Sequence, residues 1–119
     1  MDKQVEASPA TLDTLFPNND LLTRVQSFVD GVSHIDGVNQ LILRRFNDGT
    51  ARFYAIWESS NAHHAKVTSV WEESFDGYER VRADLLVIQY SRQEFEQREA
   101  GSYQLRVAEK SVLWEKLKA

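Results

Sequence analysis

The sequence predicts a small α/β or α+β fold, in which helices cover a mixed sheet made of a β-hairpin at residues 40–58 and a strand at residues 80–90. Three observations predict it. Apolar residues recur at helical spacing early in the chain, two β-prone runs flank a turn sequence, and strand and helix patterns alternate in the second half. A length of 119 residues fits one globular domain, residues 1–119, with residues 1–7 disordered.

Two helices are expected before the hairpin. Ser8 and Pro9 have the pattern of an N-cap followed by proline at the first helical position, and Pro17 ends this short helix. A second, amphipathic helix begins at residues 18–20, because apolar residues then recur three and four positions apart. These apolar residues are Leu21, Leu22, Val25, Phe28, Val29 and Val32.

The hairpin is predicted by residues 47–49, Asn-Asp-Gly, which stand between LILRRF and ARFYAIWE. These residue types tolerate the positive φ that tight turns require. Alternation makes one face of the second strand apolar and leaves the other face mixed. The apolar face carries Phe53, Ala55 and Trp57, and the mixed face carries Arg52, Tyr54, Ile56 and Glu58.

The second half is expected to alternate helix and strand. Residues 62–75 have a helical apolar stripe between cap residues and a stop at Asp76-Gly77, although their β-branched residues leave a strand as the alternative. Residues 80–90 become continuously apolar, as in a strand covered on both faces.

The end of the chain is expected to begin with a helix capped by Ser91 and Glu94, which form a capping box. Residues 101–102, Gly-Ser, separate this helix from a last one around Leu105. Residues 112–114 fit a short edge strand or a continued helix.

Composition excludes several classes of function. Eighteen acids against fourteen bases give a net charge of −4, so no nucleic-acid partner is expected. The chain has no cysteine, and hence no disulfide framework or thiolate site. No stretch approaches the ~20 apolar residues of a membrane span, and the first residues lack a signal-peptide pattern. We therefore expect a cytoplasmic protein with no membrane partner.

Metal and cofactor sites have little support in the sequence. The candidate metal ligands are His63 and His64, with His34 and Glu58 elsewhere, because imidazole and carboxylate bind Zn²⁺. Adjacent histidines on a helix point about 100° apart, so both cannot face one ion easily. No glycine-rich phosphate loop and no nucleophile elbow are present. We assign no metal and no cofactor.

The stretch from residue 83 to 117 resembles the C-terminal third of minimal nucleotidyltransferase domains. It contains Asp84 followed by LLVI, then the polar helix RQEFEQRE, the Gly-Ser break at residues 101–102, and Val-Leu-Trp-Glu at residues 112–115. The resemblance implies that Asp84 stands where the family has its third metal-binding carboxylate, which helps to hold two Mg²⁺ ions.

This chain departs from the family pattern elsewhere. The family's Gly-Ser pair after the first strand and its two aspartates one residue apart on the next strand are both missing. The resemblance therefore implies a degenerate relative. Asp84 has an ordinary structural alternative, in which it caps a helix or pairs with Arg80 or Arg82.

The candidate binding surface lies on the hairpin and consists of Arg44, Arg45, Arg52, Tyr54 and Trp57. Arginine and aromatic residues are common at protein interfaces, although these arginines can instead pair with acids on neighbouring strands. An exposed hairpin edge also favours pairing with a second copy, so we expect a protein partner or a homodimer.

Three functions follow as hypotheses. The first is a non-catalytic protein-interaction or self-association module. The second is a nucleotide- or small-ligand-binding enzyme of nucleotidyltransferase type, with a pocket at the strand carboxyl ends near Asp84. The third is a small-molecule binder whose apolar cavity is lined by Phe53, Trp57 and Trp71.

Overall fold

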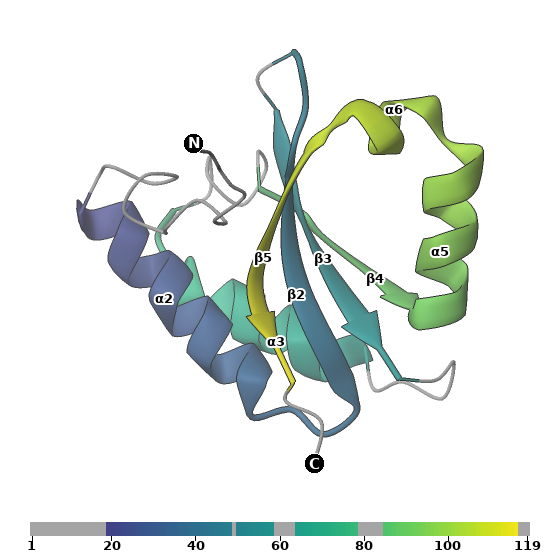
Figure 1. The fold of residues 1–119 in the computed structure, drawn as a ribbon. Coiled ribbons are helices and arrows are strands. Elements are labelled where there is room, and N and C mark those ends of the chain that lie inside the picture. The colour runs from purple at the N-terminus through teal and green to yellow at the C-terminus, as the bar shows by residue number, and fades with distance from the viewer. Residues whose placement is uncertain (1–18, 49, 59–63, 79–84, 117–119) are drawn as a thin grey trace, which may run out of the picture.

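The computed structural model describes residues 19–48, 50–58, 64–78 and 85–116, and its elements are shown in Figure 1. The expected α+β class, with helices on a mixed sheet, is confirmed. The short helix expected from Ser8 and the residues expected at the start of the 80–90 strand lie outside the described residues. In order, the elements are α2 (Asn19–Ser33), β2 (Val38–Arg45), β3 (Ala51–Trp57), α3 (His64–Ser74), β4 (Val87–Ser91), α5 (Arg92–Gly101), α6 (Tyr103–Val107) and β5 (Glu109–Glu115).

The sheet has the strand order β4-β3-β2-β5. The hairpin strands β2 and β3 are antiparallel and occupy its centre, β5 pairs antiparallel with β2, and β4 pairs parallel with β3. Parallel neighbours need a crossover connection, and α3 lies in the one between β3 and β4. The helical alternative for residues 62–75 is thus confirmed over His64–Ser74.

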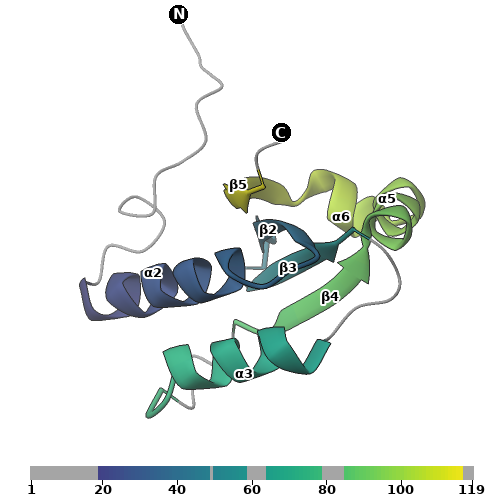
Figure 2. The ribbon, with the colours of Figure 1, turned by 90° about the horizontal axis from the view of Figure 1, so that it is seen from below.

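Helices cover both faces of the sheet (Figure 2). On one face, α2 and α3 cover what we call the first core, whose buried residues are Val25, Phe28, Val32, Val38, Leu41, Leu43, Phe53, Ala55, Trp57, Val67, Phe75 and Leu85. On the other face, α5 and α6 cover the second core, which consists of Ile42, Tyr54, Ile56, Phe95 and Leu105. Neighbouring residues of β2 and β3 alternate between the two cores, as the pleat requires.

Local sequence explains where several elements begin. Gly37 has φ +94° and lies between α2 and β2, a conformation that a residue with a Cβ rarely adopts. The Ser91–Glu94 capping box begins α5 as expected: the Ser91 side chain accepts from the Glu94 N–H, and the Glu94 carboxylate accepts from the Ser91 N–H. These bonds hold the pKa of Glu94 below its usual range.

The last element is a strand, which decides between the two alternatives for residues 112–114. β5 pairs with β2 along its length, from Arg45 opposite Glu109 to Gln40 opposite Glu115. Pairing with a strand that is distant in sequence, rather than local propensity, fixes this conformation.

Arg44 is buried in the second-core face of the sheet, with 2% of its surface exposed. Its Nη1 donates to the carbonyl oxygens of Leu105, at 2.8 Å, and Ala108, at 3.3 Å. Its Nη2 donates to the Glu99 carboxylate, and its guanidinium lies 5.7 Å from the Phe95 ring centroid. Arg44 was expected on an exposed binding surface; instead it ties α5 and α6 to β2.

Replacing Arg44 is expected to destabilise the fold. Arg44→Ala leaves two carbonyls and the Glu99 carboxylate without their donor, and we expect a loss of about 3 kcal/mol in the free energy of unfolding. The matched control is Arg45→Ala, because Arg45 is half-exposed and lies 3.6 Å from Glu109. This exposed pair should contribute about 0.5 kcal/mol or less. Urea denaturation of both variants measures the difference, and equal losses would contradict the structural role of Arg44.

Candidate interaction surface

The expected arginine and aromatic surface is not exposed as a unit. Besides Arg44, Tyr54 and Trp57 are each 2% exposed, because α5 and α3 cover the two faces of β3. Burial raises the pKa of the Tyr54 phenol. The Trp57 Nε1–H donates to Gln89 Oε1 at 2.9 Å, which satisfies its polar atom. Only Arg45 and Arg52 of the expected set remain at the surface.

The hairpin also does not provide the expected open edge. Within the described part of the chain, β4 and β5 are the edge strands, and both strands of the hairpin have neighbours on each side. Any pairing of sheet edges between copies must therefore involve β4 or β5.

Of the metal and nucleotide candidates, His34, Glu58 and His64 lie in the described part of the chain. His63 and Asp84 lie outside the described residues, and His64 is an exposed residue at the start of α3 whose ring centroid lies 5.9 Å from that of Trp57. Over the ranges that the structure describes, no three His, Cys, Asp or Glu side chains are grouped as a metal site. In the same ranges, no helix has the length and apolar character needed to span a membrane.

A pocket at the strand carboxyl ends is expected near Asp84, which lies outside the described residues, whereas the next two residues, Leu85 and Leu86, are described. The Phe53 N–H donates to the Leu86 carbonyl at 2.9 Å, so the residues directly after position 84 lie beside the first residues of β3. This is the amino end of the parallel pair, whereas its carboxyl ends are Trp57 and Ser91. Of the residues expected to line an apolar cavity, Phe53 and Trp57 are instead buried in the first core, where the Phe53 ring packs against Phe28 and Phe75.

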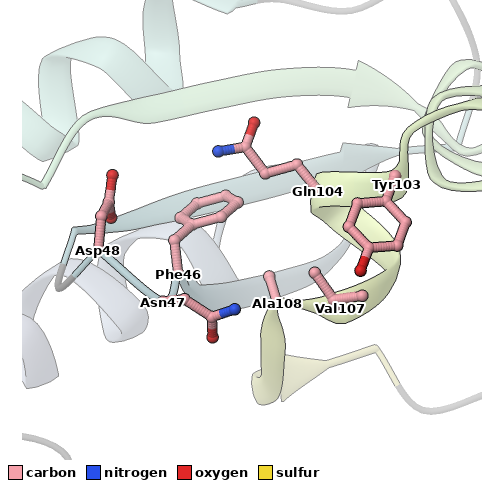
Figure 3. A pocket seen from close by; sticks show the side chains of 7 residues that line it. All are labelled: Phe46, Asn47, Asp48, Tyr103, Gln104, Val107 and Ala108. Atoms are coloured by element: carbon pink, nitrogen blue, oxygen red, sulfur yellow. The ribbon is translucent and has the colours of Figure 1, made fainter.

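A surface hollow of about 400 Å³ lies between the hairpin turn and α6 (Figure 3). The hairpin side contributes Phe46, and the helix side contributes Tyr103 and Val107. Tyr103 is 73% exposed and Val107 is 46% exposed, and Leu86 is the third strongly exposed large apolar residue in the described part. We call this site the hairpin hollow, and its lining is Phe46, Asn47, Asp48, Tyr103, Gln104, Val107 and Ala108.

The hairpin wall of the hollow is held by its own turn. The Phe46 N–H donates to the Thr50 carbonyl at 2.8 Å. The Asp48 carboxylate accepts from the Thr50 N–H at 2.9 Å and from its hydroxyl at 2.6 Å, and these bonds lower the pKa of Asp48. The Arg52 guanidinium lies 5.4 Å from the Phe46 ring centroid. The ring is thus fixed by the turn and by a cation–π contact.

The helical wall follows from the two faces of α6. The Ser102 side chain accepts from the Leu105 N–H at 3.2 Å and caps the helix, and Leu105 packs into the second core. Tyr103 and Val107 are four residues apart and share the opposite side. The sequence contains a signal for this exposed side. Tyr103 and Val107 lie two residues before and after Leu105, and a helix that buries Leu105 turns these two positions away from the core.

Comparisons with protein-family models, with curated proteins and with solved structures give no match for this chain. The function therefore has to be inferred from the geometry of the chain itself.

Proposed function

We propose that this chain is a non-catalytic module that acts by binding protein, and that the hairpin hollow receives an apolar side chain of a protein partner. The observation that carries the proposal is the exposure of Tyr103 and Val107 beside the hollow. Single exposed apolar side chains are ordinary, but neighbouring ones around a concavity are typical of binding sites.

The chemistry of the hollow supports a protein partner over a small polar substrate. Its centre is apolar, and Asn47, Gln104 and the Asp48 carboxylate lie at its margin. Asp48 already accepts two bonds from Thr50, so it is committed to the turn. An aromatic residue on a fixed helix provides contact area at low entropic cost, as at interface anchors.

Removing the apolar wall should weaken partner binding while leaving the fold intact. We expect the Tyr103→Ser, Val107→Ser double variant to bind its partner about 30-fold more weakly, as for an interface anchor worth about 2 kcal/mol. Leu86→Ser is the matched control, because Leu86 is 45% exposed and does not line the hollow.

The measurement has two stages. Quantitative affinity capture with the wild type, the double variant and the control identifies a partner, and titration of the purified pair gives the dissociation constants. Loss of binding in the double variant alone supports the proposal. Equal affinities for all three chains would sink it.

A nucleotide- or small-ligand-binding enzyme of nucleotidyltransferase type, with a pocket near Asp84, is the second candidate. Its support is the order of elements in the resembling stretch: strand β4, polar helix α5, a break at Ser102 and helix α6. The two functions differ in what they predict for nucleotide binding.

On the protein-binding proposal, millimolar ATP with Mg²⁺ should leave the melting temperature of the chain unchanged. A ligand that binds only the folded state at 100 times its dissociation constant adds about 2.7 kcal/mol of stability, which a thermal-shift titration detects easily. A Mg²⁺-dependent rise in melting temperature that is lost in Asp84→Asn would favour the nucleotidyltransferase-like candidate instead.

A further inference from the structure

The two edges of the sheet offer different surfaces. β4 has five residues and contacts both α3 and α5, whereas β5 has seven residues and contacts α2. In the part of the chain that the structure describes, β5 pairs with β2 alone. An edge strand presents a row of backbone N–H and C=O groups, so β5 is the edge at which another strand can add (Figure 2).

The sequence of this edge has the same Glu-Lys dipeptide at both ends. Residues 109–116 read Glu-Lys-Ser-Val-Leu-Trp-Glu-Lys, with an uncharged centre. When two copies of such a strand pair antiparallel, the first residues of one strand lie beside the last residues of the other. Register decides whether opposite or like charges meet, and a bulge in β5 fixes the register.

The bulge is at Leu113. Val112 lies opposite Ile42, but Leu41, the neighbour of Ile42, lies opposite Trp114, so Leu113 is an extra residue. Leu113 and Trp114 both pack against the first core, and Val112 packs against the second. Successive side chains of β5 otherwise alternate between the two faces of the sheet, and the extra residue at the bulge shifts this alternation by one position. The first-core face carries Glu109, Ser111, Trp114 and Lys116, and the second-core face carries Lys110, Val112 and Glu115.

A two-fold axis through Val112 and perpendicular to the sheet makes the two strands antiparallel and keeps matching faces continuous. Without the bulge, this axis would place Glu109 opposite Glu115 of the second copy, and like charges would repel. With the bulge, Lys110 faces Glu115 and Glu109 faces Lys116 of the second copy. Symmetry makes each of these attractive pairs occur twice.

The charges at this edge remain available to a second copy. Among the described residues, these charges form three pairs within one chain, all at the surface, with nitrogen-to-oxygen distances of 3.5 to 3.9 Å. Exposed pairs of this length are weak and exchange readily with water or with another charge. The pairs are Arg45–Glu109, Glu99–Lys110 and Glu58–Lys116.

We infer that two copies of this chain associate by antiparallel pairing of β5, with Val112 at the two-fold axis, so that their sheets become continuous. This inference rests on the proposed function, protein association, and names a second copy as one partner. It involves a different set of side chains from the hairpin hollow. The pairing can therefore be absent while the hollow still binds another protein.

Charge exchange tests the pairing. Lys110→Glu alone and Glu115→Lys alone each place like charges in both 110–115 contacts, so each variant should dimerise at least about tenfold more weakly than the wild type. An equimolar mixture of the two variants restores both attractions and should form a mixed dimer of wild-type affinity. Sedimentation equilibrium of the full chain measures all four samples.

The mixture separates pairing between copies from effects within one copy, because neither chain in it regains its own lost charge. A control, Lys66→Glu, changes an exposed charge on α3 and should leave the dimer unchanged. The inference is overturned if the wild type is still a monomer at about 1 mM, or if the mixture dimerises no more tightly than each variant alone. The Tyr103→Ser, Val107→Ser variant should still dimerise, which distinguishes failure of the hollow from failure of the edge.

Discussion

The arrangement of this fold depends on the bonds from Arg44 to α5 and α6. A guanidinium buried to this extent carries a large desolvation cost, which the bonds of Nη1 and Nη2 offset, while Nε has no hydrogen-bond partner among the described residues. The Leu105 and Ala108 carbonyls at the end of α6 need donors in turn, because a helix leaves its last carbonyls unpaired. The Arg44 guanidinium and the carbonyls at the end of α6 therefore satisfy each other. As a result α6 ends over β2, and the chain leaves it in position to begin β5 beside Arg45.

An element could be predicted from the sequence when the residues that fix it are close together along the chain. The helix before the hairpin, the pairing of the two hairpin strands and the Ser91 capping box are set by neighbours in the chain, and the sequence predicts them correctly. Arg44 and Tyr54 were placed at the surface because the cover on their face, α5 and α6, lies about fifty residues later in the sequence. Likewise, only pairing with β2 makes residues 112–114 a strand.

The candidate site was harder to predict than the fold. Arg45 and Arg52 stay exposed, but neither of them lines the hollow. The central residues, Tyr103 and Val107, lie on a five-residue helix whose orientation depends on Leu105 entering the second core. Both proposed contacts come from the stretch after Gly101, since α6 supplies the wall of the hollow and β5 supplies the sheet edge. Both proposals thus place binding in the C-terminal segment of the chain.

The pairing of β2 with β5 has a consequence for how the chain folds during synthesis. Ile42 and Val112 are neighbours in the sheet, although 70 positions separate them along the chain. The hairpin, α3 and β4 can assemble from contacts closer in sequence, which form sooner because closing shorter loops costs less entropy. Until residues 109–115 leave the ribosome, the outer side of β2 is an unpaired strand beside a partly covered second core. For that interval the nascent chain exposes the kind of surface that chaperones bind.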